Sequence, residues 1–185
     1  MKMNTFLVLS VVIFTACNNE KKESAADAVQ ANVPTTETKQ APIEFTDAKY
    51  MDIGKKGIAD LSSGNIDNWM TSYADNAIYR WNNGDSLVGK KAISDYWKKR
   101  RTEAIDSISF HDDIWLPVKV NEPQQKVQSP GIWLLGWYRV DAKYKTGKRM
   151  TQWIHTDTHF DNQDKIDLVI QYLDRALINA ALAKK

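Results

Sequence analysis

The chain has 185 residues, a formal net charge of +2, 43% hydrophobic residues and a single cysteine. One cysteine excludes an intramolecular disulfide, and a charge this close to balance gives no general attraction to nucleic acid or to anionic lipid. The length allows one domain once a short N-terminal segment is set aside.

Residues 1–16 have the pattern of a secretory signal peptide. Lys2 precedes an apolar run, Phe6 to Ala16, that is too short to span a bilayer and ends in small residues before Cys17. The Phe-Thr-Ala-Cys sequence ending at Cys17 resembles the lipobox of bacterial lipoproteins. The resemblance implies a lipidated Cys17 and a domain held at the bacterial cell envelope, outside the cytoplasm. The residue after the cysteine is Asn18 rather than an Asp. In this the sequence resembles lipoproteins sent to an outer membrane, which favours that location.

Residues 17–42 are predicted to be the lipidated cysteine and a disordered tether. This stretch has no aromatic residue, and its branched apolar side chains are only Val29 and Val33, too few to offset the cost of ordering the backbone. An ordinary signal peptide followed by a free thiol stays open as the alternative. Residues 43–182, which hold all seven Trp and all seven Tyr, form the predicted domain.

The first half of this domain is predicted to be mainly helical. Helices are expected over residues 45–62, ending at Gly64, over 65–73, and over 90–104, with short strands at 77–81 and 86–88. In the third helix Ile93, Tyr96 and Trp97 share one face, and the cations of residues 98–101 lie mostly on the other. The sequence therefore predicts a solvated helix face here and no nucleic-acid interface.

The second half is predicted to be almost entirely β. Strands are expected over residues 105–120, with a break near 111–113, and over 131–144, 148–161 and 166–173. Residues 145–147 form the predicted hairpin loop, with Gly147 in the left-handed position. Helices first and antiparallel strands afterwards predict an α+β domain, with the helices on one face of a curved antiparallel sheet.

Four segments together resemble the nuclear transport factor 2-like superfamily, which includes ketosteroid isomerase and SnoaL-like polyketide cyclases. They are Gly64-Asn65-Ile66-Asp67, Tyr73-Ala74-Asp75-Asn76-Ala77, Gly89-Lys90-Lys91-Ala92-Ile93 with Tyr96-Trp97, and Asp164-Lys165-Ile166 with Tyr172-Leu173-Asp174. The resemblance implies a cone in which helices close the concave face of a bent sheet over a deep pocket. It also implies a homodimer through the outer face of the sheet. The fold implies no single reaction.

The resemblance to ketosteroid isomerase does not extend to its catalytic residues. Trp81 stands where the general-base Asp is expected, Gly57 where the oxyanion-hole Tyr is expected, and Thr156 where the partnering Asp is expected. The chain therefore lacks the general base that moves the proton and the two hydrogen-bond donors that stabilise the oxyanion. Steroid isomerisation is not expected. No cofactor is expected either.

His155 and Asp157 are the remaining candidates for acid–base catalysis. Alternation places both on one face of their strand together with His159, while Thr156 lies on the other face. A metal site is not expected, because positions 155 and 159 lie about 13 Å apart on a strand. The isomerase alignment turns Thr156 inward, whereas the predicted hairpin pairs Trp137 with His155 on a more aromatic face. The sequence leaves open which face lines the pocket.

The predicted function is a membrane-tethered small-molecule-binding or accessory domain with an aromatic-lined pocket. Its ligand is expected to be a small apolar or aromatic molecule. The predicted pocket-lining residues are Tyr73, Tyr79, Trp81, Trp97, Trp115, Trp137, Thr156 and Tyr172. Two alternatives are a SnoaL-like cyclase, dehydratase or hydrolase using His155 and Asp157, and a dimerising assembly domain without a ligand.

Overall fold

The computed structural model describes residues 40–126 and 128–183. The predicted signal peptide, Cys17 and nearly all of the predicted tether lie outside the described residues. The elements in chain order are β1 (Ile43–Phe45), α1 (Lys49–Ser63), α2 (Ile66–Met70), β2 (Tyr73–Trp81), β3 (Ser86–Val88), α3 (Lys90–Lys99), the π-helical turn η1 (Arg100–Ala104), β4 (Ile105–Val120), β5 (Gly131–Tyr144), β6 (Arg149–Phe160), β7 (Ile166–Tyr172) and α4 (Arg175–Leu182).

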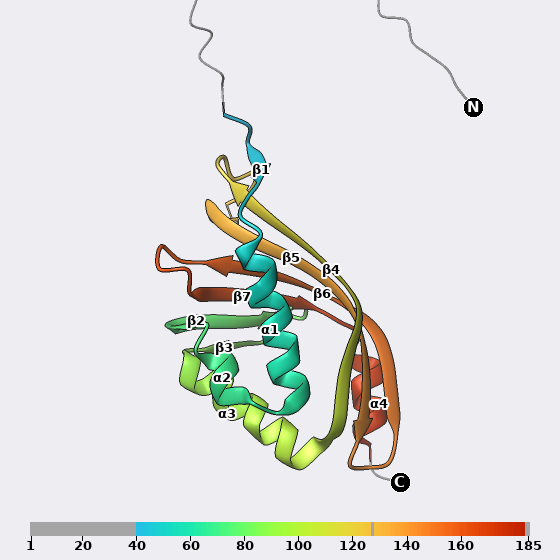
Figure 1. Cartoon of the computed structure of the whole chain (residues 1–185). Helices are drawn as coiled ribbons and strands as arrows, with labels where there is room; N and C mark the ends of the chain where they lie inside the picture. The colour runs from blue at the N-terminus through green and yellow to red at the C-terminus, as the bar shows by residue number, and fades with distance from the viewer. Residues whose placement is uncertain (1–39, 127, 184–185) are drawn as a thin grey trace, which may run out of the picture. The chain divides into compact units, whose positions relative to one another are not determined.

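The strands form one sheet in the order β1-β4-β5-β6-β7-β2-β3. The neighbours pair antiparallel except β2 and β7, which pair parallel. The long strands β4, β5 and β6 bend, and α1 crosses the concave side of the sheet with α2 and α3 beside it (Figure 1). The predicted α+β class, with helices on the concave face of a curved sheet, is confirmed.

The helix ends follow from their capping residues. Gly64 ends α1 in the left-handed conformation, with φ 82°, and its backbone N–H donates to the carbonyl of Leu61. The Asn65 side chain accepts from the backbone N–H of Asn68 and so caps α2. Gly64 is the predicted end of the first helix, and Asn65 lies at the predicted start of the second, because both signals depend on residues close in the chain.

The β5–β6 hairpin has the predicted pairing. The backbone N–H of Tyr144 donates to the Lys148 carbonyl at 2.9 Å, and Gly147 has φ 84° in the loop. Along both strands the even-numbered positions are buried, except for Ile132 near the start of β5. The predicted break in β4 is a bulge between His111 and Ile114, where Asp112 has φ 56°.

Strand β1 and helix α4 were not predicted. β1 pairs with β4 at Val118–Val120. The predicted first helix, α1, starts at Lys49, four residues after its predicted start. Helix α4 follows the last strand, where the Asp174 side chain accepts from the backbone N–H of Ala176 and caps it. α4 packs on β6.

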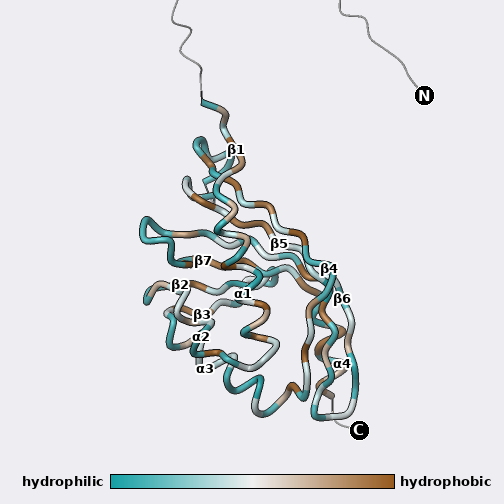
Figure 2. The backbone as a smooth tube through the Cα atoms, viewed as in Figure 1, coloured by the Kyte–Doolittle hydropathy of each residue, from teal (hydrophilic) through white to brown (hydrophobic). Residues whose placement is uncertain are grey.

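Trp115 joins the helical layer to the sheet. It pairs in register with Gly136 on β5, and its ring fills the space that a Cβ would occupy at Gly136 and at Gly54 of α1. The two glycines therefore allow the close approach of α1, β4 and β5. Figure 2 shows hydrophobic stretches along the strands and hydrophilic residues at the turns that connect them.

Candidate functional site

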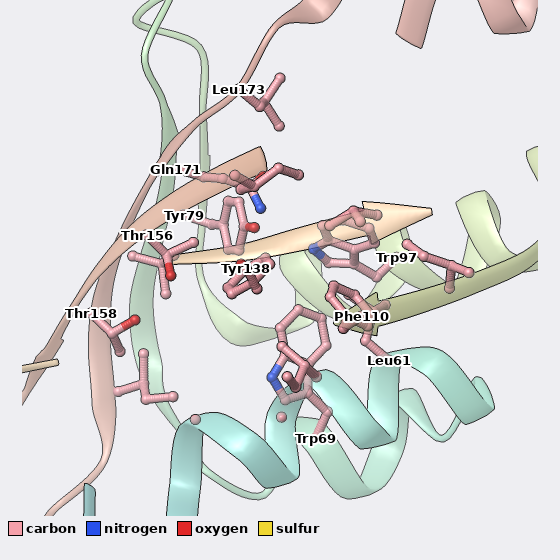
Figure 3. Close-up of a pocket in the computed structure, with 18 of the residues that line it drawn as sticks. Leu61, Trp69, Tyr79, Trp97, Phe110, Tyr138, Thr156, Thr158, Gln171 and Leu173 are labelled. Atoms are coloured by element: carbon pink, nitrogen blue, oxygen red, sulfur yellow. The ribbon is translucent and has the colours of Figure 1, made fainter. Parts of the chain in front are cut away.

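A cavity of about 100 Å³ lies between the helices and the concave face of the sheet. It is large enough for several waters or a very small organic molecule before any side chain moves. Figure 3 shows the rings of Trp69, Tyr79, Trp97 and Tyr138 facing this central space, with Thr156 and Thr158 entering from β6. Aliphatic side chains of α1, β4, β5, β7 and α4 complete a predominantly apolar wall.

Tyrosine hydroxyls supply several of the polar groups of the cavity. Tyr73, Tyr79, Tyr138 and Tyr144 all line it. Burial raises the pKa of each of these phenols above its ordinary value. The hydroxyls are therefore protonated at neutral pH and can donate hydrogen bonds to a ligand.

Trp97 and Arg100 add two further donors. The Trp97 side chain is 7% exposed, its indole N–H has no hydrogen-bond partner, and the ring nitrogen is turned toward the central space (Figure 3). The Arg100 guanidinium lies 5.6 Å from the ring centre of Tyr96 and 6.0 Å from that of Trp97. It is also close enough to Tyr144 to offset part of the rise that burial causes in the pKa of that phenol.

Arg100 was not predicted to line the cavity, because the cations of residues 98–101 were expected mostly on the solvated face of the helix. Position 100 follows Ile93 by seven residues, however, and two helical turns return a side chain to nearly the same face. The seven-residue spacing from the buried Ile93 therefore indicated that Arg100 faces the interior.

Trp81 lines a second cavity, of about 200 Å³, rather than the central one. The two cavities share Trp97, Arg100 and Gln171 in their walls. The Trp81 indole N–H donates to the Gln171 side chain at 3.1 Å, and the Arg175 guanidinium lies 5.2 Å from the Trp81 ring. The expectation that Trp81 lines the main pocket is corrected to this side cavity, whose wall it shares with Arg175.

His155 and Asp157 lie on the outer face of the sheet, away from the central cavity. The imidazole Nε2 is 2.8 Å from a carboxylate oxygen of Asp157, and Nδ1 is 3.0 Å from the Gly136 carbonyl oxygen. The Trp137 ring stacks on His155 with 4.4 Å between ring centres. The expectation that this pair lines the pocket is wrong, although its predicted pairing with Trp137 is confirmed.

The reason is that strand pairing fixes which residues share a face, but not which face is covered by helices. The inner face carries Thr156 and Thr158, as the isomerase alignment implied. Aromatic content was a poor guide, because the outer face is also rich in aromatic side chains. Trp137 and Tyr172, predicted to line the pocket, both lie on this outer face.

The outer face has its own groove, of about 280 Å³, which includes Trp133, Leu135, Asp157, Ile170 and Tyr172. Burial raises the pKa of the Asp157 carboxyl, and the neighbouring imidazole opposes that rise. Tyr172 is 43% exposed at the edge of this groove.

Five of the eight predicted pocket residues line the central cavity: Tyr73, Tyr79, Trp97, Trp115 and Thr156. Gly57, at the position of the oxyanion-hole Tyr, also lines it, and a Cβ there would lie 2.9 Å from the Trp69 indole nitrogen. The described lining residues include no carboxylate, imidazole or thiol. The cavity therefore offers donors and apolar surface but no side-chain base of those three kinds.

Among residues 40–126 and 128–183, no group of three or more His, Cys, Asp or Glu side chains is placed to hold a metal ion. None of the helices formed by these residues is long and apolar enough to cross a membrane.

Comparison with solved structures identifies the fold. A nuclear transport factor 2-like protein of unknown function from Burkholderia pseudomallei is 10% identical with a TM-score of 0.59, covering 74% of this chain and 99% of that one. A Mycobacterium tuberculosis epoxide hydrolase of the LEH-like type is 12% identical with a TM-score of 0.52, covering 71% and 86%. A Catenulispora acidiphila protein with a ketosteroid isomerase-like fold, solved with trimethylamine, is 12% identical with a TM-score of 0.54, covering 72% and 94%.

The domain has the nuclear transport factor 2-like fold, as the sequence resemblance implied. A comparison of the sequence with known protein families finds no match, and neither does a comparison with curated proteins. The identities to the solved structures are low, so the likeness defines the fold alone.

Proposed function

We propose that this chain is a membrane-tethered small-molecule-binding domain whose central cavity takes a small apolar or aromatic molecule. The observation that carries the proposal is the chemistry of the cavity wall. Aromatic and aliphatic side chains provide the contact surface, and a few convergent donors provide orientation, as in many ligand sites.

Binding is a better account of this wall than catalysis. General acid–base chemistry needs a group that can accept a proton near neutral pH. Burial raises the pKa of every phenol in the wall, so none of them is a base near neutral pH. The enzyme alternative relied on His155 and Asp157 facing inward, and both face outward.

A filled cone would favour the assembly alternative, whereas a cavity is present. A homodimer through the sheet is compatible with ligand binding and remains part of the proposal. Its support is the apolar surface on the outer side, where Ile114 and Trp153 are each 53% exposed.

The ligand proposal is tested by filling the cavity. Ile58 on α1 lines it, and Ile58→Phe is expected to weaken binding of toluene and cyclohexanol at least tenfold, because the larger ring occupies their space. Binding is followed by intrinsic fluorescence, since Trp69, Trp97 and Trp115 form part of the wall.

Val88→Phe is the matched control, because Val88 is 68% exposed on β3 and lies outside the cavity lining. It is expected to bind both compounds like the wild type. Absence of any saturable binding to the wild-type chain would overturn the proposed function. Equal binding by the two variants would show that the compounds bind elsewhere.

The tether proposal is supported by the lipobox-like sequence ending at Cys17. Replacing Cys17 by serine removes the only thiol that a lipid can modify, so the protein is expected to move from membranes to a soluble exported fraction. Cell fractionation and immunoblotting measure this, with Asn19→Ser as the control. A wild-type chain in the soluble fraction, or Cys17→Ser still on membranes, would refute lipid anchoring and the outer-membrane location with it.

A further inference from the structure

The basic helix α3 and the turn after it place one cation, Arg100, in the walls of both cavities. Lys90, Lys91, Lys98 and Lys99 each lie within 4.0 Å of a carboxylate oxygen, of Asp75, Asp95, Asp67 and Glu103 respectively. Arg101 donates to the Ser62 carbonyl, has two buried nitrogens without a hydrogen-bond partner, and lines neither cavity. In the described part of the chain no carboxylate lies within 4.0 Å of Arg100. The Tyr144 hydroxyl is its neutral polar neighbour, and its buried Nε has no hydrogen-bond partner.

A guanidinium without a carboxylate partner in an apolar wall is costly. Arginine stays charged at any pH at which the protein folds, so the charge cannot be removed by deprotonation. The ring faces of Tyr96 and Trp97 stabilise the cation partly, but neither ring carries a negative charge that would balance it. A group from outside the chain that carries negative charge would satisfy Arg100.

A second unsatisfied donor lies on the same helix face three residues earlier. The Trp97 indole N–H is buried without a partner, and the indole is more than nine-tenths buried. Trp97 and Arg100 both line the central and the side cavities, so the two donors meet where these spaces adjoin. Leaving such donors unpaired costs stability unless a ligand supplies acceptors.

From these two donors we infer that the site binds an apolar carboxylate, with the carboxylate on Arg100 and Trp97 and the apolar body in the central cavity. This inference rests on the proposed function and specifies its ligand class. Among the described residues that line the two cavities, Arg100 is the one cation without a carboxylate partner, which calls for a single negative charge, and the planar guanidinium fork matches a carboxylate. The other arginine of the side cavity, Arg175, is already paired with Asp85 at 2.5 Å.

The same geometry assigns different roles to the two arginines that could recognise a carboxylate. Arg139 lies on the outer face, where its guanidinium is 3.2 Å from Asp112 and 3.7 Å from Asp141. Its charge is matched within the chain. Arg100 is therefore the anion-binding residue of the cavity.

Isosteric ligand pairs test the inference on the full chain. Benzoate and benzamide have nearly the same shape, as do hexanoate and hexanamide, but only the acids are charged at pH 7. Titration calorimetry is expected to give at least tenfold tighter binding of each acid than of its amide. Arg100→Gln is expected to abolish this preference, because the variant has no guanidinium to pair with the carboxylate.

Matched variants distinguish recognition of the carboxylate by Arg100 from attraction to the overall positive charge of this helix. Lys99→Gln removes one positive charge from an exposed neighbour and is expected to keep the tenfold preference. Trp97→Phe keeps a ring but loses the N–H, and it is expected to weaken the acids a fewfold. If Arg100→Gln does not fold by circular dichroism, Arg100→Lys tests the same point, because it keeps the charge but loses the fork and is expected to retain only part of the preference.

The outcomes distinguish this inference from the proposed function. Equal binding of acid and amide by the wild type would overturn the carboxylate site while the small-molecule site stands. A preference that survives in Arg100→Gln, or is lost equally in Lys99→Gln, would also overturn it. Absence of binding by all four compounds and by toluene would overturn both.

Discussion

Gly136→Val is expected to destabilise the domain by about 3 kcal/mol. Valine has a higher β-propensity than glycine, so at an open strand position the change would favour folding. At Gly136 a Cβ would lie 2.4 Å from the Trp115 ring and 3.1 Å from the Thr156 hydroxyl oxygen. The indole would have to move out of the contact between α1 and the sheet. Urea unfolding followed by circular dichroism measures the loss.

Ser107→Val, at an exposed position of β4, is the matched control and is expected to change stability by less than about 0.5 kcal/mol. Gly54→Ala tests the same contact from the helix side, where a Cβ would lie 2.7 Å from the Leu134 side chain and 2.9 Å from the Trp115 ring. Alanine normally stabilises a helix over glycine by about 1 kcal/mol, so a loss of stability would be diagnostic. A Gly136→Val chain as stable as the wild type would show that Trp115 does not hold the helix against the sheet.

Trp81→Asp is expected to cost about 3 kcal/mol or more of stability without creating an isomerase. The change removes a buried indole, breaks the hydrogen bond to Gln171, and leaves a buried carboxyl group. A restored carboxylate would still lack the two donors of the isomerase mechanism, because Gly57 and Thr156 occupy those positions. The measurements are chemical unfolding and a steroid ketone isomerisation assay.

Trp81→Phe is the control, since it keeps most of the apolar surface and loses only the indole N–H. It is expected to cost less than Trp81→Asp. Isomerase turnover by the wild-type chain would contradict the binding proposal. Unchanged stability of Trp81→Asp would contradict the buried placement of Trp81.

Much of the fold follows from local sequence signals. The strand bounds of β3 and β5 agree with the prediction, because turn-forming residues such as Asn83, Gly84 and Gly131 delimit them. The stop at Gly64 and the bulge near Asp112 were also readable from short stretches. Helix α4 was missed although Asp174 is a good cap, because its eight residues follow the last strand of the family-like pattern.

The site was only partly predictable, because a cavity wall depends on long-range packing. The two-residue period of β6 put His155 with Asp157 and separated both from Thr156, and this is confirmed. Whether α1 covers the even or the odd positions is decided by contacts such as that of Trp115 with Gly54, far apart in the chain. The position of Arg100 could have been predicted from its helical spacing to Ile93. It was missed because Arg100 lies in a run of cations that resembles a solvated helix face.

The most direct test of the proposed function is a ¹⁵N NMR titration of the tryptophan indole N–H groups with benzoate and toluene. The cavity proposal predicts that Trp69 and Trp97 shift in a saturable manner, because their rings form the wall of the central space. Trp153 is expected not to shift, because it is 53% exposed on the outer face. Saturable shifts at Trp153 and Trp133 with Trp97 unchanged would place the ligand on the outer face and contradict the proposal.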